Sequence, residues 1–184
     1  MCLRDVAPQP WRKGGSSTRE LLTWPEAQGW RLRVSVAAIT QDGDFSAFPG
    51  VDRWFAVLHG EGVALALPAG GVEVRGDSDA VHFAGESAPS CRLLGGATQD
   101  LNLMVLRGSG RATLRRAHAG SALQGSSLWR GLYAAQDLTI ECDGLPLHLG
   151  ADTLLWSDAL APSEWRLQPR SQPLQAWWLN LEAA

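Results

Sequence analysis

The sequence predicts an all-β fold built from two jelly-roll or β-barrel lobes packed together, and three observations lead to this expectation. Apolar and polar residues alternate from Trp30 to Ile39, and a period of two is typical of a half-buried strand. Short apolar runs bounded by Gly, Pro, Asp or Ser recur along the remaining chain, in the cadence of a sandwich or barrel. The 20 glycines and 10 prolines are spread through the 184 residues, so they mark turns between strands.

The expected strands divide into two groups. After Trp30–Ile39, the first half continues with Trp54–Leu58, Val63–Leu67, Val72–Val74, Val81–Phe83, Cys91–Leu94 and Leu101–Leu106. The second half contains Leu128–Tyr133, Leu138–Glu141, Leu145–Leu149, Thr153–Trp156, Trp165–Leu167 and Leu174–Leu181. A weak echo links Phe55-Ala-Val-Leu with Leu132-Tyr-Ala-Ala. We therefore expect an N-terminal lobe of residues 1–110 and a C-terminal lobe of residues 111–184, joined by a hinge at Gly108-Ser-Gly110.

Composition narrows the classes of partner. A net charge of −3 and a pI near 5.8 provide no positive field for a nucleic acid. No apolar run approaches the length of a membrane span, and the N-terminus lacks the apolar stretch of a secretion signal. Cys2, Cys91 and Cys142 are odd in number and form no C-x-x-C pair, which favours a reducing compartment. We expect a cytoplasmic protein that binds neither nucleic acid nor membrane.

The segment from Asp42 to Arg53 is the strongest candidate for a ligand site. Asp42-Gly43 and Pro49-Gly50 are turn signals, so the segment should form a loop between strands. Within it the aromatic residues Phe45 and Phe48 flank Ser46, just before Arg53 enters the next strand. A guanidinium can grip a carboxylate through two parallel hydrogen bonds. The alternative for Arg53 is an ion pair with Asp52 or Asp44.

A second polar group lies on the predicted strand Leu101–Leu106. Alternation places Asp100, Asn102 and Met104 on one face and the leucines on the other. Inside a barrel, the first face would line a cavity with a carboxylate, an amide and a thioether, whereas the alternative for Asp100 is a structural hydrogen bond.

Metal and covalent chemistry have little support. The chain has four histidines, His59, His82, His118 and His148, with no H-x-H pair, and His59 alone has a close acidic neighbour, Glu61. No metal-ligand cluster is visible, and there is no G-x-S-x-G nucleophile motif. We therefore expect no metal, no cofactor and no catalytic residue, with His59 as a lone pocket base the less favoured alternative to a solvated turn.

Three motifs resemble the HutD/Ves family. Phe45-Ser-Ala-Phe-Pro-Gly-Val-Asp-Arg53 is similar to the family pattern F-S-x-F-P-G-x-[DE]-R, and Asp100-Leu-Asn-Leu-Met104 to D-[FL]-N-[VI]-M. Pro10-Trp-Arg-Lys-Gly-Gly-Ser-Ser-Thr-Arg-Glu20 is similar to W-[RK]-N-G-x-G-x-T-R-E, with Lys13 in place of the usual Asn. The resemblance covers about Trp11 to Met104. It implies a bicupin fold and an association with histidine utilisation, without a defined reaction.

The leading hypothesis is therefore a metal-independent binding protein for a small carboxylate, such as an intermediate of histidine breakdown, with a regulatory role. Trp11, Thr18 and Arg19 should lie in a segment folded over the barrel mouth. The expected ligand-binding residues are Arg53, Phe45, Ser46, Phe48, Asn102, Asp100, Met104, Thr18 and Arg19. One alternative is a metal-independent isomerase, lyase or hydrolase in which Asp100 or His59 moves a proton. The other is a structural or interaction protein, and a homodimer is compatible with each hypothesis.

Overall fold

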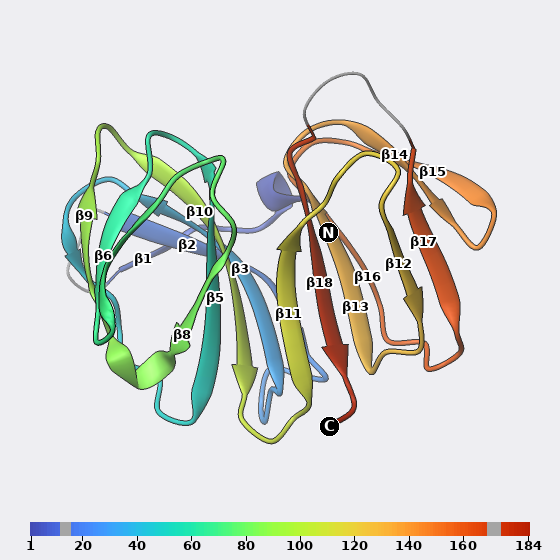
Figure 1. The fold of residues 1–184 in the computed structure, drawn as a ribbon, viewed down its shortest axis with the longest axis horizontal. Helices are drawn as coiled ribbons and strands as arrows, with labels where there is room; N and C mark the ends of the chain where they lie inside the picture. Colours follow the sequence, from blue (N-terminus) through green and yellow to red (C-terminus); the bar gives the residue numbers. More distant parts are fainter. Residues whose placement is uncertain (12–15, 169–173) are drawn as a thin grey trace. The chain divides into compact units, whose positions relative to one another are not determined.

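The computed structural model describes residues 1–11, 16–168 and 174–184 and is almost entirely β-sheet. The described chain separates into two compact units (Figure 1), one formed by Val6–Ser109 and the other by Gly110–Ala184 together with Met1–Asp5. The boundary lies next to the division expected at residue 110, but the first five residues belong to the second unit. There, Leu3 donates its backbone N–H to the carbonyl of Asp152 at 2.8 Å. In the described residues, no helix is long and apolar enough to cross a membrane.

The Val6–Ser109 unit consists of two antiparallel sheets, of six and four strands. The six-stranded sheet has the order β1-β2-β3-β10-β5-β8 and the four-stranded sheet the order β4-β9-β6-β7. The strands are β1 (Gln9–Pro10), β2 (Ser16–Trp24), β3 (Leu32–Ile39), β4 (Gly43–Asp44), β5 (Val51–His59), β6 (Val63–Leu67), β7 (Gly70–Val74), β8 (Val81–Ala84), β9 (Ser90–Leu93) and β10 (Thr98–Leu106), with a 3₁₀ turn η2 at Gly85–Ser87.

The second unit has two four-stranded antiparallel sheets, β11-β18-β13-β16 and β12-β17-β14-β15. Its elements are η1 (Leu3–Asp5), β11 (Arg111–Arg116), β12 (Ala122–Gly125), β13 (Trp129–Ala134), β14 (Leu138–Cys142), β15 (Leu145–Leu149), β16 (Thr153–Ser157), β17 (Ser163–Leu167) and β18 (Ala176–Glu182). Its core includes Leu132, Ile140, Trp165 and Trp178, which are at most 5% exposed.

The two units share one strand order. Adding eight to each strand number converts β3-β10-β5-β8 into β11-β18-β13-β16, and β4-β9-β6-β7 into β12-β17-β14-β15. Antiparallel strands in two such four-stranded sheets form a jelly roll. The echo between Phe55-Ala-Val-Leu and Leu132-Tyr-Ala-Ala lies on the corresponding strands β5 and β13, so the similarity in sequence, although weak, coincides with a repeat in topology.

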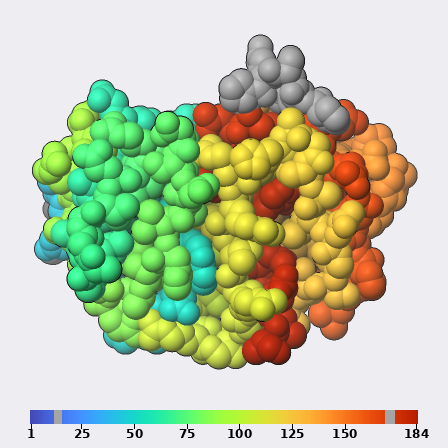
Figure 2. All heavy atoms as spheres, viewed as in Figure 1, coloured from blue at the N-terminus to red at the C-terminus, as the bar shows by residue number. Residues whose placement is uncertain are grey.

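The core of the first unit explains why its strands pair in this way. Phe55 and Val57 on β5 and Leu65 on β6 are at most 1% exposed and belong to one cluster with Val63 and Val74. These side chains recur at alternate positions, so each sheet turns one apolar row toward the cluster. In the space-filling view, residues of the teal to green segment that contains β6, β7 and β8 cover much of this unit on the face shown (Figure 2).

The structure differs from the sequence-based prediction in three details. The sheets are open, because each has two edge strands, so the described chain contains no closed barrel. Thr18 and Arg19, expected in a segment over the barrel mouth, lie in strand β2, which pairs with β3 along its length. Arg111–Arg116, which no expected strand covered, is strand β11 and pairs with β18. Residues 12–15 of the first family motif, Lys13 among them, lie outside the described part of the chain.

Candidate functional site

A cavity of about 870 Å³ lies in the Val6–Ser109 unit, on the face of the six-stranded sheet that carries polar side chains. The sheet register brings these side chains together. Asn102 on β10 is paired with Ser35 on β3, and Asp100 with Ala37. Met104 is paired with Arg33 on one side and with Arg53 on the other. Residues paired across antiparallel strands share a face, and all of these residues line the cavity.

The structure gathers eight of the nine predicted binding residues around this cavity. They are Thr18, Phe45, Ser46, Phe48, Arg53, Asp100, Asn102 and Met104. Arg19 does not line it, because Thr18 and Arg19 are consecutive on β2 and point to opposite faces. The Arg19 guanidinium instead donates to the carbonyl of Val6. The expected role of Arg19 therefore has no geometric support.

Arg53 is held among aromatic rings at the cavity wall. Its Cζ atom lies 5.0 Å from the ring centre of Phe45, 5.5 Å from that of Phe48 and 5.2 Å from that of Phe83. Such contacts stabilise a cation in a partly desolvated place. The residue is only 7% exposed, and burial lowers the pKa of Arg53 to about 10, with the charge of Asp100 raising it and that of Arg33 lowering it. Arg53 still carries its charge at neutral pH.

The hydrogen bonds of Arg53 go to neutral acceptors. Nη2 donates to Oδ1 of Asn102 at 3.1 Å, and Nη1 donates to the carbonyl of Ser46 at 3.4 Å. Asp52, one of the two ion-pair partners considered for Arg53 from the sequence, pairs instead with Arg107, with 2.9 Å between Oδ1 and Nε. Because its bonded neighbours carry no charge, the positive charge of Arg53 is available to an anion in the cavity.

Asp100 continues the row of hydrogen-bonded side chains that begins with Arg53 and Asn102. Nδ2 of Asn102 donates to Oδ2 of Asp100, while Oδ1 is buried without a hydrogen-bond partner among the described residues. Burial raises the pKa of Asp100 to about 8, although the hydrogen bond from Asn102 and the charge of Arg53 both lower it. Burial thus favours the protonated, uncharged form of this carboxyl, next to the positive charge of Arg53.

Arg33 and Ser35 also face the cavity, and the sequence-based prediction missed them. Ser35 is 4% exposed, and the Arg33 side chain forms an ion pair with Glu20 on β2, with 2.6 Å between Nε and Oε2. Alternation in Trp30–Ile39 places both residues opposite Leu32 and Val34, which was a usable signal. The missing information was that β3 and β5 flank β10, which only the pairing shows.

The rim of the cavity combines an aromatic contact and two carboxylates. Trp11 donates its indole N–H to the hydroxyl of Thr18 at 2.8 Å and meets Phe45 edge to face, with ring centres 6.0 Å apart. Asp42 and Asp44 line the cavity from β4 and the residue before it. Of these, Asp42 accepts a hydrogen bond from the backbone N–H of Leu93 at 2.8 Å, which fixes β4 against β9.

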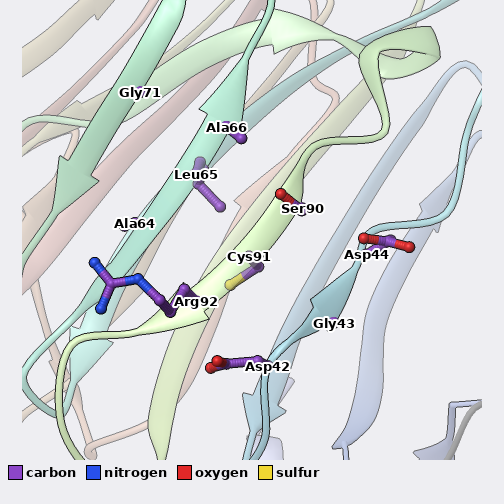
Figure 3. Close-up of a pocket in the computed structure, with 10 residues that line it drawn as sticks. All are labelled: Asp42, Gly43, Asp44, Ala64, Leu65, Ala66, Gly71, Ser90, Cys91 and Arg92. Atoms are coloured by element: carbon purple, nitrogen blue, oxygen red, sulfur yellow. The ribbon is translucent and has the colours of Figure 1, made fainter.

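Asp42 and Asp44 also border a second hollow, an open groove of about 540 Å³ on β6 and β9. Figure 3 shows Asp42 directed toward β9 and Arg92 extending across β6, with Ser90 and Cys91 beside them. Burial raises the pKa of Cys91 to about 12, so its thiol stays protonated and is a poor nucleophile. The groove has no buried charged group comparable with Arg53.

Other chemistry finds little support in the described residues. His59, the alternative pocket base, is exposed at the end of β5 and does not line the cavity. Within the described ranges, no cluster of three or more His, Cys, Asp or Glu side chains is placed to hold a metal ion. In the second unit, Arg130 is 1% exposed and donates to the carbonyls of Ser163 and Gly125. Its guanidinium thus serves to join strands.

The comparison with family models decides what kind of protein this is. The model described as HutD matches residues 3–174. The chain belongs to the HutD family. The family resemblance of the three sequence motifs is therefore confirmed, and the match extends well beyond the first half of the chain, where those motifs lie.

Relatives of this HutD-family chain are bacterial. It is 37% identical over 134 residues to an uncharacterised 21.2 kDa protein in the hutC 3′ region of Pseudomonas putida, a match that covers 72% of this chain and 70% of that protein. It is 33% identical over 117 residues to protein Ves of Citrobacter koseri, covering 62% of this chain and 61% of that protein. The match thus spans less than two thirds of the length of the Ves protein.

Solved structures agree on the fold. A conserved protein of unknown function from Pseudomonas aeruginosa PAO1 has a TM-score of 0.89 and 29% identity, covering all of this chain and 97% of that one. HutD from Pseudomonas fluorescens SBW25 has a TM-score of 0.85 at 24% identity, covering 98% and 96%. A cupin 2 conserved barrel domain protein from Leptotrichia buccalis has a TM-score of 0.59 at 10% identity, covering 97% and 93%. This HutD-family chain therefore has a cupin-like fold.

Proposed function

We propose that this protein binds a small carboxylate in the cavity of the Val6–Ser109 unit, without a metal, and that binding serves a regulatory role in histidine utilisation. The observation that carries the proposal is the buried guanidinium of Arg53, which faces the cavity while its hydrogen bonds go to the uncharged Asn102 side chain and Ser46 carbonyl. A buried cation whose hydrogen bonds go only to neutral groups is costly. A ligand anion would supply the missing charge.

The surroundings of Arg53 favour a carboxylate over a larger anion. Arginine presents parallel N–H donors that match the two oxygens of a carboxylate. Phe45 and Phe48 fix the guanidinium plane and provide apolar walls for the carbon skeleton of a ligand, as small-molecule sites commonly do. Burial favours the neutral form of Asp100, which weakens its repulsion of an incoming anion.

The pathway assignment rests on a relative. The Pseudomonas putida protein lies in the hutC 3′ region, and a binding protein encoded there would sense an intermediate of histidine breakdown. The repeated strand order supports the further proposal that the two units are the halves of a bicupin, with residues 1–110 and 111–184 as its lobes. In that arrangement the first lobe carries the binding site. In the second lobe the guanidinium of the buried Arg130 already donates hydrogen bonds to the carbonyls of Ser163 and Gly125.

A thermal-shift screen tests the proposal. Purified protein is heated with intermediates of histidine breakdown, other small carboxylates and the matched amides. A carboxylate at 100 times its Kd stabilises by about 2.7 kcal/mol, which raises the unfolding midpoint by roughly 5–10 °C. Arg53→Met should abolish the shift, whereas Arg92→Met, which removes an exposed charge elsewhere, should preserve it. Equal shifts with carboxylates and amides, or a full shift in Arg53→Met, would reject the proposal.

A second candidate is a metal-independent enzyme that uses Asp100 for proton transfer. The observation in its favour is that burial brings the pKa of Asp100 near 8, which suits a group that takes up and releases protons at neutral pH. NMR spectra of each bound carboxylate, recorded over hours, test this function. Conversion that disappears in Asp100→Asn supports an isomerase, lyase or hydrolase, while unchanged ligand spectra reject it. A protein that binds no carboxylate but self-associates would instead support the interaction role and a homodimer.

A further inference from the structure

Two arginines face the cavity from the same row of the sheet. Met104 on β10 is paired with Arg33 on β3 and with Arg53 on β5, so the arginines flank one strand. Adjacent strands lie about 4.8 Å apart, which puts the two Cα atoms roughly 10 Å from each other. Both side chains line the same hollow of about 870 Å³. The cavity wall therefore carries two arginine side chains from one row of the sheet.

The charges on this row are unequally compensated. Arg33 has an ion-pair partner in Glu20, whose side chain is 30% exposed. Arg53 is bonded to neutral acceptors. The two cations also repel each other, because the charge of Arg33 contributes to the lowered pKa of Arg53. A single bound carboxylate would neutralise one cation and leave Arg33 dependent on the partly exposed Glu20.

From this arrangement we propose that the ligand is a dicarboxylate, with one carboxylate on Arg53 and the second on Arg33 in competition with Glu20. The inference rests on the proposed function and specifies the class of its ligand. Arg53 is the anchor because it is buried and rigidly held between aromatic rings. Arg33 is the residue that determines specificity, because its side chain is 20% exposed and its partner can be displaced.

Calorimetric titration with glutarate and with its monoamide tests the inference. The two probes have the same length, but the amide lacks one negative charge. A charge-assisted hydrogen bond of ordinary strength corresponds to about tenfold or more in Kd. We expect the wild type to bind glutarate at least about tenfold more tightly than the monoamide. Arg33→Met should bring the two Kd values to within about threefold while leaving monoamide binding intact.

A second variant keeps the test independent of any folding defect in Arg33→Met. Glu20→Gln removes the competitor and should tighten glutarate binding several-fold without affecting the monoamide. Arg92→Met, on the exposed side of β9, is the matched control for the loss of one positive charge and should change neither Kd. Succinate and adipate, one carbon shorter and longer, then define the preferred spacing.

The possible outcomes separate the two claims. Equal Kd values for glutarate and monoamide in the wild type, with both lost in Arg53→Met, would overturn the dicarboxylate inference and leave carboxylate binding standing. A preference for glutarate that persists in Arg33→Met and is insensitive to Glu20→Gln would also overturn it. If the wild type binds neither these probes nor any monocarboxylate, both claims fail.

Discussion

Replacing Asp100 by Asn should change how stability depends on pH, because Asp100 titrates differently in the folded and unfolded chain. An unfolded aspartate has a pKa near 3.9, whereas burial raises the pKa of Asp100 to about 8 in the fold. The folded state therefore holds a proton that the unfolded state releases. This contribution to stability is fully present below about pH 4 and is lost as pH rises toward about 8.

The size of the effect follows from the linkage relation. Within that window the free energy of unfolding should fall by about 1.4 kcal/mol per pH unit on account of this one group. Asn is close in shape and cannot titrate. The stability of Asp100→Asn minus that of the wild type should therefore grow by about 3 kcal/mol between pH 5 and pH 7.5, an order-of-magnitude figure.

Urea unfolding followed by circular dichroism at pH 5, 6, 7 and 7.5 measures this difference. Taking the difference between variant and wild type cancels the histidines and other carboxylates that both proteins share. Asp79→Asn, in an exposed loop, is the matched control for the change from a carboxyl to an amide. The same pH dependence in both variants, or a constant difference for Asp100→Asn, would mean that Asp100 is ionised throughout, and the description of an uncharged carboxyl beside Arg53 would be wrong.

Three further predictions concern other parts of the structure. Arg19→Gln should leave the Kd for a carboxylate within about twofold, because its guanidinium donates to the carbonyl of Val6; a large loss in calorimetry would place Arg19 in the site after all. Thr18→Val removes the acceptor of the Trp11 indole N–H and should cost about 1 kcal/mol in urea unfolding, whereas an unchanged midpoint would show the bond to be dispensable. Leu3→Ala should destabilise by about 2 kcal/mol or more, since Leu3 is 5% exposed within the second unit; wild-type stability would show that Met1–Asp5 is not anchored there.

The sequence predicted most strands because apolar alternation accompanies burial. The strands from β5 to β10 and from β13 to β18 all overlap expected runs. It missed β2, since Ser16, Thr18 and Glu20 carry no apolar alternation: the first two line the polar cavity, and the third forms an ion pair with Arg33. A strand with one face toward a polar cavity lacks the apolar alternation by which strands are recognised.

The candidate site was predictable only in part. The loop motif singled out Phe45, Phe48 and Arg53, and alternation put Asp100 on the same face as Asn102. Sequence alone could not show that β10 lies between β3 and β5, so the row containing Arg33 stayed hidden. Nor could it show that Asn102, and not an aspartate, is the hydrogen-bond partner of Arg53, because alternation assigns faces but no distances.

A crystal structure of the protein with the tightest-binding carboxylate of the thermal-shift screen tests the central claim most directly. We predict ligand density in the cavity of the Val6–Ser109 unit, with a carboxylate oxygen about 2.7–3.2 Å from a terminal nitrogen of Arg53 and the carbon skeleton beside Phe45 and Phe48. Ligand bound elsewhere, such as in the open groove on β6 and β9, with the Arg53 guanidinium unliganded, would contradict the account.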